Sequence, residues 1–319
     1  MPLWVVQLLQ VMTAQLLLAL IPIALLIALG AWLKHRRFLA DSFWAQAERL
    51  GYYVLLPALF LHSLATAKLE DVPVQGMIGA LVLSTVTVAV LLVGARPLLK
   101  DNDPAFTSVF QGGVRFNNYV GVSAAAGLFG AQGIALAAVA NAAIVPTVNI
   151  LCVLVFARYG AGGRMPARKV ARQLALNPLV LACFGGILLQ ALDLGLPVGI
   201  EPMIKALGQA SLPLGLLCVG AALELGSVRS WVRPLAWSSL CKFLIMPVVT
   251  LLACHLAGLQ GPAAITALLF QALPTASSSY IMARQLGGDA PLMAGIIASQ
   301  TLLAAIALPV AVMLLTPWI

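Results

Sequence analysis

Residues 110–130 read FQGGVRFNNYVGVSAAAGLFG, and residues 270–288 read FQALPTASSSYIMARQLGG. Both stretches open with Phe-Gln, carry a Tyr about nine residues later and close on Leu-x-Gly. In each stretch, polar residues interrupt an apolar run where a membrane-spanning helix would be continuous. A matched pair of interrupted hydrophobic segments in the two halves of a chain is the best sequence indication of a transporter's binding site.

The composition around these stretches is that of a polytopic membrane protein. Hydrophobic residues make up 62% of the chain, charged residues 9%, and the mean hydropathy is +1.03. A soluble domain carries roughly 25% charged residues, so an all-α membrane protein is predicted, with apolar helices that each need about 20 residues to cross a bilayer. Ten such segments lie near 13–33, 48–66, 74–96, 105–129, 133–157, 174–194, 203–223, 232–256, 262–286 and 290–315.

The basic residues predict how the chain lies in the membrane. The formal charge of +8 is concentrated in alternate loops, because fourteen of the 18 Lys and Arg residues fall on one side if the N-terminus is outside. Basic residues near helix ends mark the cytoplasmic side. Both termini are therefore predicted on the outer side, and the positive charge indicates membrane orientation rather than nucleic-acid binding.

The two halves of the chain resemble each other. The longest charged loop divides the sequence into a first five-helix repeat (1–158), a short cytoplasmic loop (159–172) and a second repeat (173–319). An odd number of helices per half makes the second copy enter the membrane from the opposite side, which gives an inverted repeat. The fourth and ninth segments then run antiparallel, and their interruptions both reach the membrane midplane.

A break in a membrane helix is tolerated only where protein buries it or where it lines a cavity. The second half-helices would begin near Tyr119 and Ser277, and their N-termini carry free N–H groups and partial positive charge that favour an anion. The nearby residues that could bind a carboxylate are Gln111, Asn117, Asn118, Gln271, Pro274, Thr275, Ser277, Ser278, Ser279 and Tyr280. For the Asn, Ser and Thr residues the alternative is helix capping alone, and for the glutamines it is bridging between helices.

Two cations lie deep within predicted membrane segments. Arg115 and Lys242 are each about ten residues from the start of their segments, and a charge at that depth normally faces a partner or a watery cavity. One alternative pairs Arg115 with Asp101 or Asp103, and Lys242 with Glu224. Otherwise the missing counter-charge is the substrate, and both residues belong to an anion site.

Several motifs resemble one known family. Arg115-Phe116-Asn117-Asn118, Asn177-Pro178-Leu179 and Leu273-Pro274-Thr275-Ala276 are similar to motifs of the auxin efflux carriers, which include plant PIN exporters and bacterial malonate or malate carriers. The resemblance implies ten helices in an inverted 5+5 repeat, similar to sodium/proton antiporters and bile-acid symporters, with crossed, broken helices four and nine. It also implies a scaffold of helices 1, 2, 6 and 7 and a transport domain of helices 3–5 and 8–10. By the same resemblance Asn117 would bind the substrate carboxylate.

The predicted function is secondary transport of small organic anions by alternating access, in an elevator-like movement. Candidate substrates are mono- or dicarboxylates such as malonate, malate or auxin-like acids. Plant members of the family have a long loop between helices five and six, whereas this chain has a short one, so the resemblance implies a protein of the bacterial inner membrane. The family also suggests a homodimer. No cofactor and no enzymatic activity are expected, while a coupling proton or sodium ion stays open. The alternatives are a sodium-coupled symporter or sodium/proton antiporter on the same fold and, more distantly, an intramembrane hydrolase. The hydrolase would use Ser277, Ser278 or Ser279 as nucleophile and His62 or His255 as base.

Overall fold

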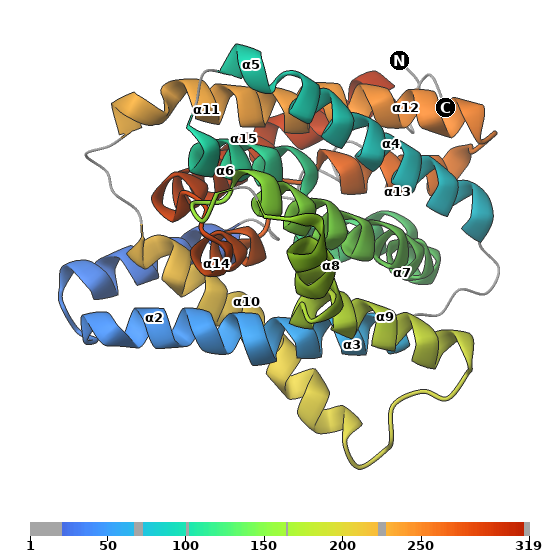
Figure 1. The fold of residues 1–319 in the computed structure, drawn as a ribbon. Helices are drawn as coiled ribbons and strands as arrows, with labels where there is room; N and C mark the ends of the chain where they lie inside the picture. The colour runs from blue at the N-terminus through green and yellow to red at the C-terminus, as the bar shows by residue number, and fades with distance from the viewer. Residues whose placement is uncertain (1–20, 67–72, 100–101, 164, 223–227, 316–319) are drawn as a thin grey trace.

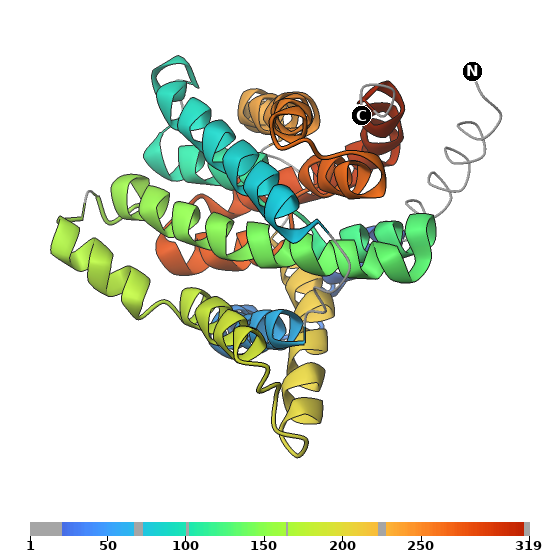
Figure 2. The same cartoon turned by 90° about the vertical axis from the view of Figure 1, so that its right-hand side faces the viewer.

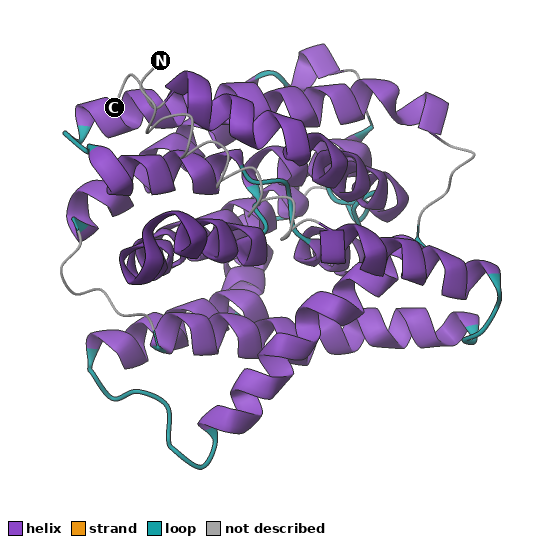
Figure 3. Cartoon of the chain, turned by 180° about the vertical axis from the view of Figure 1, so that it is seen from behind, coloured by secondary structure: helices purple, strands orange, loops and turns teal. Residues whose placement is uncertain are grey.

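The computed structural model describes residues 21–66, 73–99, 102–163, 165–222 and 228–315. All regular secondary structure in these ranges is helical, as Figure 3 shows and as the sequence predicts. The helices, with η for a π-helical turn, are Ile21–His35, α2 (Asp41–Leu50), η1 (Gly51–Leu55), α3 (Leu56–Ala65), α4 (Val74–Gly94), α5 (Arg96–Leu99), α6 (Asp103–Val114), α7 (Asn118–Tyr159), α8 (Ala167–Ala175), α9 (Pro178–Ala191), α10 (Glu201–Ala221), α11 (Val228–Leu240), η3 (Cys241–Ile245), α12 (Met246–Leu256), α13 (Gly261–Ala272), α14 (Ser277–Leu286) and α15 (Ala290–Leu315).

Five helices in the described ranges are long and apolar enough to cross a membrane, and a sixth is added if α8 and α9, bent by 53° at their junction, form one span. The halves of the two broken segments fall short of this length. α6 and α13 have 12 residues each, about 18 Å at 1.5 Å per residue, against a hydrocarbon core of roughly 30 Å. The assignment of ten spans and the inverted repeat stay predictions.

The helices form three layers (Figures 1 and 2). α2, α3 and α9 lie along one face, where α10 crosses them, and α4, α11 and α12 lie along the opposite face. α6, α7, α13 and α14 lie between these faces, and α15 runs from this middle layer to the face of α11 and α12. The middle layer therefore holds both interrupted segments.

The two interruptions are built alike. Arg115, the residue that follows α6, has an extended backbone (φ −80°, ψ 161°), and Leu273, the residue that follows α13, is extended too (φ −63°, ψ 146°). The chain resumes its helical course at Asn118 in α7 and at Ser277 in α14. The polar stretches of the sequence are therefore true helix breaks, as predicted.

The chain also folds back sharply within α7. Gly130 has a φ of +56°, a conformation that glycine adopts without steric cost. A Cβ atom at Gly133 would lie 1.9 Å from the carbonyl oxygen of Ala125, although eight residues of straight helix would separate these positions by about 12 Å. α7 consequently consists of two helical arms joined by a tight turn.

Apolar side chains cover much of the outer surface. The large exposed ones include Leu25, Leu29, Val90, Leu91, Leu181, Phe184, Leu188, Leu252, Leu256, Leu302 and Ile306. Exposed apolar area on this scale is unusual for a water-soluble monomer and is expected of a surface that contacts lipid.

Close helix packing at Gly220 gives a stability prediction. A Cβ atom there would lie 1.9 Å from the carbonyl oxygen of Ile27 on the neighbouring helix. Gly220→Ala should therefore push α10 away from that helix and lower the unfolding free energy by about 1–3 kcal/mol, measured as a lower unfolding temperature in detergent. Gly79→Ala is the matched control, because a Cβ atom there meets nothing within 4 Å. Equal unfolding temperatures for the two variants would contradict the packing argument.

Candidate functional site

The two helix breaks touch each other. The backbone N–H of Asn117, in the first break, donates a hydrogen bond to the carbonyl oxygen of Pro274 in the second, at 2.8 Å. The Asn117 side chain is buried, and its Oδ1 accepts from the N–H of Val120 at 3.4 Å, so it caps the start of α7. The two breaks, whose crossing the family resemblance implies, are thus joined by a direct backbone hydrogen bond.

Gln300 of α15 satisfies backbone groups of both breaks. Its Oε1 accepts from the N–H of Thr275 at 3.0 Å, and its Nε2 donates to the carbonyl oxygen of Gly112 at 3.1 Å and to Ser238 Oγ at 3.0 Å. One side chain therefore connects the end of α6 to the second break. Unpaired backbone groups are costly in a low-dielectric interior, so this glutamine stabilises the crossing.

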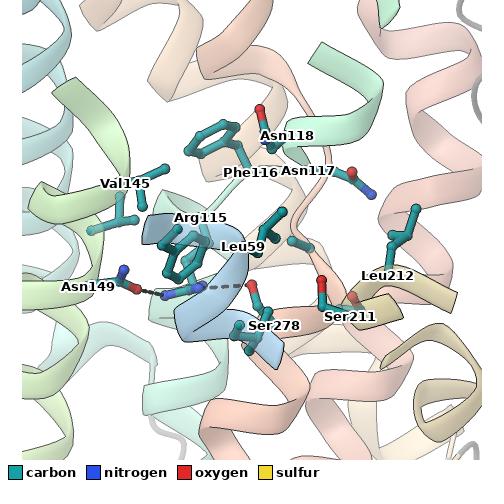
Figure 4. Close-up of a pocket in the computed structure, with 15 residues that line it drawn as sticks. Leu59, Arg115, Phe116, Asn117, Asn118, Val145, Asn149, Ser211, Leu212 and Ser278 are labelled. Carbon is teal, nitrogen blue, oxygen red and sulfur yellow. Dashed lines mark hydrogen bonds between the residues drawn. The ribbon is translucent and has the colours of Figure 1, made fainter. Parts of the chain in front are cut away.

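A small cavity lies beside the crossing (Figure 4). Its volume is about 40 Å³, room for a few water molecules, so an organic anion would have to widen it. The lining residues come from α3, both breaks, α7, α10 and α14. They are Leu56, Leu59, Phe60, Arg115, Phe116, Asn117, Asn118, Val145, Val148, Asn149, Ser211, Leu212, Ala276, Ser277 and Ser278.

Arg115 supplies the charge of this central cavity. Its side chain is only 3% exposed, and it donates to Asn149 Oδ1 at 2.8 Å and to Ser278 Oγ at 2.9 Å (Figure 4). Its Nε has no hydrogen-bond partner among the described residues. No carboxylate of the described residues lines the cavity. The guanidinium is therefore a buried positive charge with hydrogen-bonding capacity to spare.

The proposed acidic partners of Arg115 are not seen beside it. Asp103 pairs with Arg96 at 2.9 Å, and Asp101 lies outside the described residues. The described neighbours that hold the guanidinium, Asn149 and Ser278, are both neutral. The positive charge is thus uncompensated by any described carboxylate.

The start of α14 adds a second positive element. Ala276, the residue that precedes α14, has no side chain that could cap the helix. Ser277 and Ser278 form the first turn, are buried and line the cavity together with Ala276. The first N–H groups of a helix and its dipole favour negative charge. Arg115 and this helix start therefore face the same small space.

The predicted site residues separate into two groups. Arg115, Asn117, Asn118, Ser277 and Ser278 line the central cavity. The others do not, namely Gln111, Lys242, Gln271, Pro274, Thr275, Ser279 and Tyr280. The backbone of Tyr119 lies in the first turn of α7, but its side chain is outside the described part of the structure.

Residues of the second group hold the crossing together. Thr275 Oγ1 and Ser279 Oγ share a hydrogen bond of 2.9 Å. Gln111 Nε2 lies 3.8 Å from the sulfur of Met293. Lys242 donates to the carbonyl oxygen of Gln271 at 3.3 Å. These contacts bridge helices or cap their ends, which is the alternative to substrate binding for the glutamines and the hydroxyl residues.

Asn149 was missed by the sequence reasoning. It lies in the second arm of α7, in the apolar run of residues 133–157, and is fully buried. An amide in an apolar helix commonly bridges helices, and nothing in the sequence relates Asn149 to Arg115, 34 positions earlier. Its role depends on the fold-back at Gly130, which brings it beside the guanidinium.

A second polar cluster joins α2 to α14. Glu48 is only 4% exposed, and its carboxylate accepts from Tyr280 Oη at 2.6 Å and from Arg284 Nε at 3.0 Å. These residues line a cavity of about 420 Å³ together with Lys34 and Asp41. Lys34 hydrogen-bonds Asp41 and holds the pKa of that exposed carboxyl below its ordinary value. Tyr280 thus faces this second cavity rather than the central one.

A third cavity lies between α3 and α7. Its volume is about 490 Å³, and its polar lining comes from Ser63, Thr66, Asn118 and Asn141. Asn118 lines this cavity and the central one. The central cavity therefore adjoins this larger space, which carries polar side chains.

Comparison with known proteins identifies the family of this chain. Residues 15–312 match the family model described as membrane transport protein. The chain is also 28% identical, over 249 residues, to a Rhizobium meliloti (strain 1021) protein named "Putative malonate transporter". This match covers 74% of this chain and 75% of that protein. The family match spans nearly the whole chain and includes both helix breaks. This multi-pass membrane protein therefore belongs to the membrane transport protein family, the auxin efflux carrier group that its motifs resemble.

Proposed function

We propose that this protein is a secondary transporter of small organic anions, with mono- or dicarboxylates such as malonate, malate or auxin-like acids as substrates. The single observation that carries the proposal is the buried Arg115 guanidinium beside the uncapped start of α14. Charge-assisted hydrogen bonds from a guanidinium suit a carboxylate in particular. The name of the Rhizobium relative supports malonate as the first substrate to test.

Alternating access fits the placement of the three cavities. Asn118 connects the central cavity to the space between α3 and α7, which offers a path to one side. A second path would lead to the cavity between α2 and α14. There Tyr280, near the start of α14, and Arg284, in its last turn, both donate hydrogen bonds to Glu48 of α2. We propose that these bonds close the second path and break when α14 moves.

The predicted architecture completes the proposal. Ten spans in an inverted repeat, a scaffold of helices 1, 2, 6 and 7 and a moving domain of helices 3–5 and 8–10 would place Glu48 on the scaffold and Tyr280 on the moving domain. The similar construction of the two breaks supports the repeat. A bacterial inner-membrane location with both termini outside, and a homodimer formed through the scaffold, remain part of the same proposal.

The competing functions have less support. Sodium/proton antiport calls for a titratable carboxylate at the breaks, yet Glu48, the buried carboxylate in the described ranges, is held by Tyr280 and Arg284. A hydrolase needs a nucleophile and a base in contact. Ser278 instead accepts from Arg115, and His62 faces Glu201 at 3.5 Å.

Removal of the Arg115 charge tests the proposed substrate class. Arg115→Gln should raise the KM for malonate uptake into proteoliposomes by about 10- to 100-fold, because a hydrogen bond to a charged group contributes about 1.5–3 kcal/mol. Arg115→Lys should give an intermediate KM, since an ammonium keeps the charge but lacks the planar fork. Arg168→Gln, which removes an exposed arginine of α8, is the control for net charge. An unchanged KM in a correctly folded Arg115→Gln variant would remove Arg115 from the site.

The contact between α2 and α14 gives a second prediction. Tyr280→Phe removes the hydroxyl that binds Glu48, so the path to the central cavity should open more often. A cysteine placed at Ser278 should then react with a membrane-impermeant thiol reagent about 10-fold faster from one side of the membrane. The five native cysteines are all buried, which keeps background labelling low.

Asp41→Asn is the control for this experiment, because Asp41 lines the same cavity but pairs with Lys34. It should leave the labelling rate at the level of the parent protein. Equal labelling rates in Tyr280→Phe and in the parent would show that the Glu48 contact does not close the path.

A further inference from the structure

Lys242 is fully buried, yet it lies outside the central cavity. It is 0% exposed and sits in the π-helical turn η3. Pro247 follows this turn and cannot donate a backbone hydrogen bond, which favours a local departure from α-helical geometry. A buried ammonium is expensive in a membrane protein and calls for a functional explanation.

The position of the Lys242 ammonium group explains why a buried cation is needed. Lys242 Nζ donates to the carbonyl oxygen of Gln271 at 3.3 Å, in the last turn of α13 directly before the second break. The final carbonyl groups of a helix lack partners within the helix and carry partial negative charge. A cation at this point offsets both deficits.

Other buried oxygen atoms gather around the side-chain amide of the same residue, Gln271. The Gln271 amide donates to the carbonyl oxygen of Leu81 at 3.2 Å, to Ser84 Oγ at 3.0 Å and to Thr85 Oγ1 at 2.8 Å. Gln271 Oε1 is buried without a hydrogen-bond partner among the described residues. No ion pair links Lys242 to a carboxylate in those residues either; Glu224 lies outside them.

Carbonyl oxygens at the ends of broken helices are the ligands with which transporters hold sodium. Here the chain's own ammonium is bound to such a carbonyl. We propose that Lys242 is a tethered cation that occupies a monovalent-cation site at the end of α13, so that transport proceeds without sodium. This inference rests on the proposed function and adds the reason why no free coupling cation is required at this break.

The two buried cations would then have separate tasks. Arg115 faces the cavity and binds neutral side chains there, so its charge is directed at the substrate. Lys242 contacts the backbone of the last turn of α13, directly before the second break, so its charge stabilises the break itself. Loss of Lys242 should therefore be repairable by a small free cation, whereas loss of Arg115 should not.

The test is cation rescue of malonate uptake in proteoliposomes. The parent protein should transport equally in choline and in sodium buffers. Lys242→Ala leaves space for a cation. Its uptake rate in choline should be at least 10-fold lower than that of the parent, and sodium or methylammonium should raise that rate several-fold. Lys242→Met fills the same space with an apolar side chain and should stay inactive in every buffer. Lys205→Ala, on an exposed lysine of α10, is the control and should behave like the parent.

A readout without substrate separates this inference from the proposed function. Methylammonium should raise the unfolding temperature of detergent-solubilised Lys242→Ala by several degrees, whereas tetramethylammonium, which is too large for the space, should not. This result would support the cation site even if malonate proved to be the wrong substrate. The inference is overturned if parent uptake requires sodium, if Lys242→Ala transports normally in choline, or if folded Lys242→Ala responds to no cation in either assay.

Discussion

The structure depends on the backbone groups that two helix breaks release inside the protein. Each break frees carbonyl groups at the end of one half-helix and N–H groups at the start of the next, and a membrane interior offers no water to satisfy them. The breaks partly satisfy each other through the Asn117 to Pro274 hydrogen bond. Gln300 and Lys242 donate hydrogen bonds to carbonyl groups that remain, those of Gly112 and Gln271. Residues far apart in the sequence are therefore needed to satisfy the backbone near the two breaks.

This constraint also decides where charge can be used. The carbonyl groups before the breaks need donors, and the side chains that provide them are turned away from the cavity. Arg115 is instead held by Asn149 and Ser278, both neutral, which positions the guanidinium without cancelling its charge. In the proposed function, an anion would meet this guanidinium without first breaking an ion pair to a described carboxylate, but the small cavity would still have to widen.

The sequence predicted the helical class and both breaks, because a cluster of polar residues is costly in the middle of a continuous membrane helix. It could not predict which polar residues turn toward the cavity. Lys242 and Arg115 both looked like buried cations of one anion site. Lys242, however, lies in a π-helical turn and contacts the end of α13 instead of the central cavity. Asn149 and Glu48 carried no local signal, since their partners lie 34 and more than 200 positions away along the chain.

The repeated motifs suggested two equivalent helix starts, but the structure distinguishes them. α7 is preceded by Asn117, whose side chain binds the N–H of Val120. α14 is preceded by Ala276, which has no group with which to cap it. An asparagine cap satisfies one of the N–H groups that an anion would otherwise bind. Ala276 provides no such side-chain cap, although its carbonyl oxygen accepts from the N–H of Ser279 at 3.0 Å. In the proposed anion site, this difference would favour the start of α14 over the start of α7, and Arg115 donates to Ser278 in the first turn of α14.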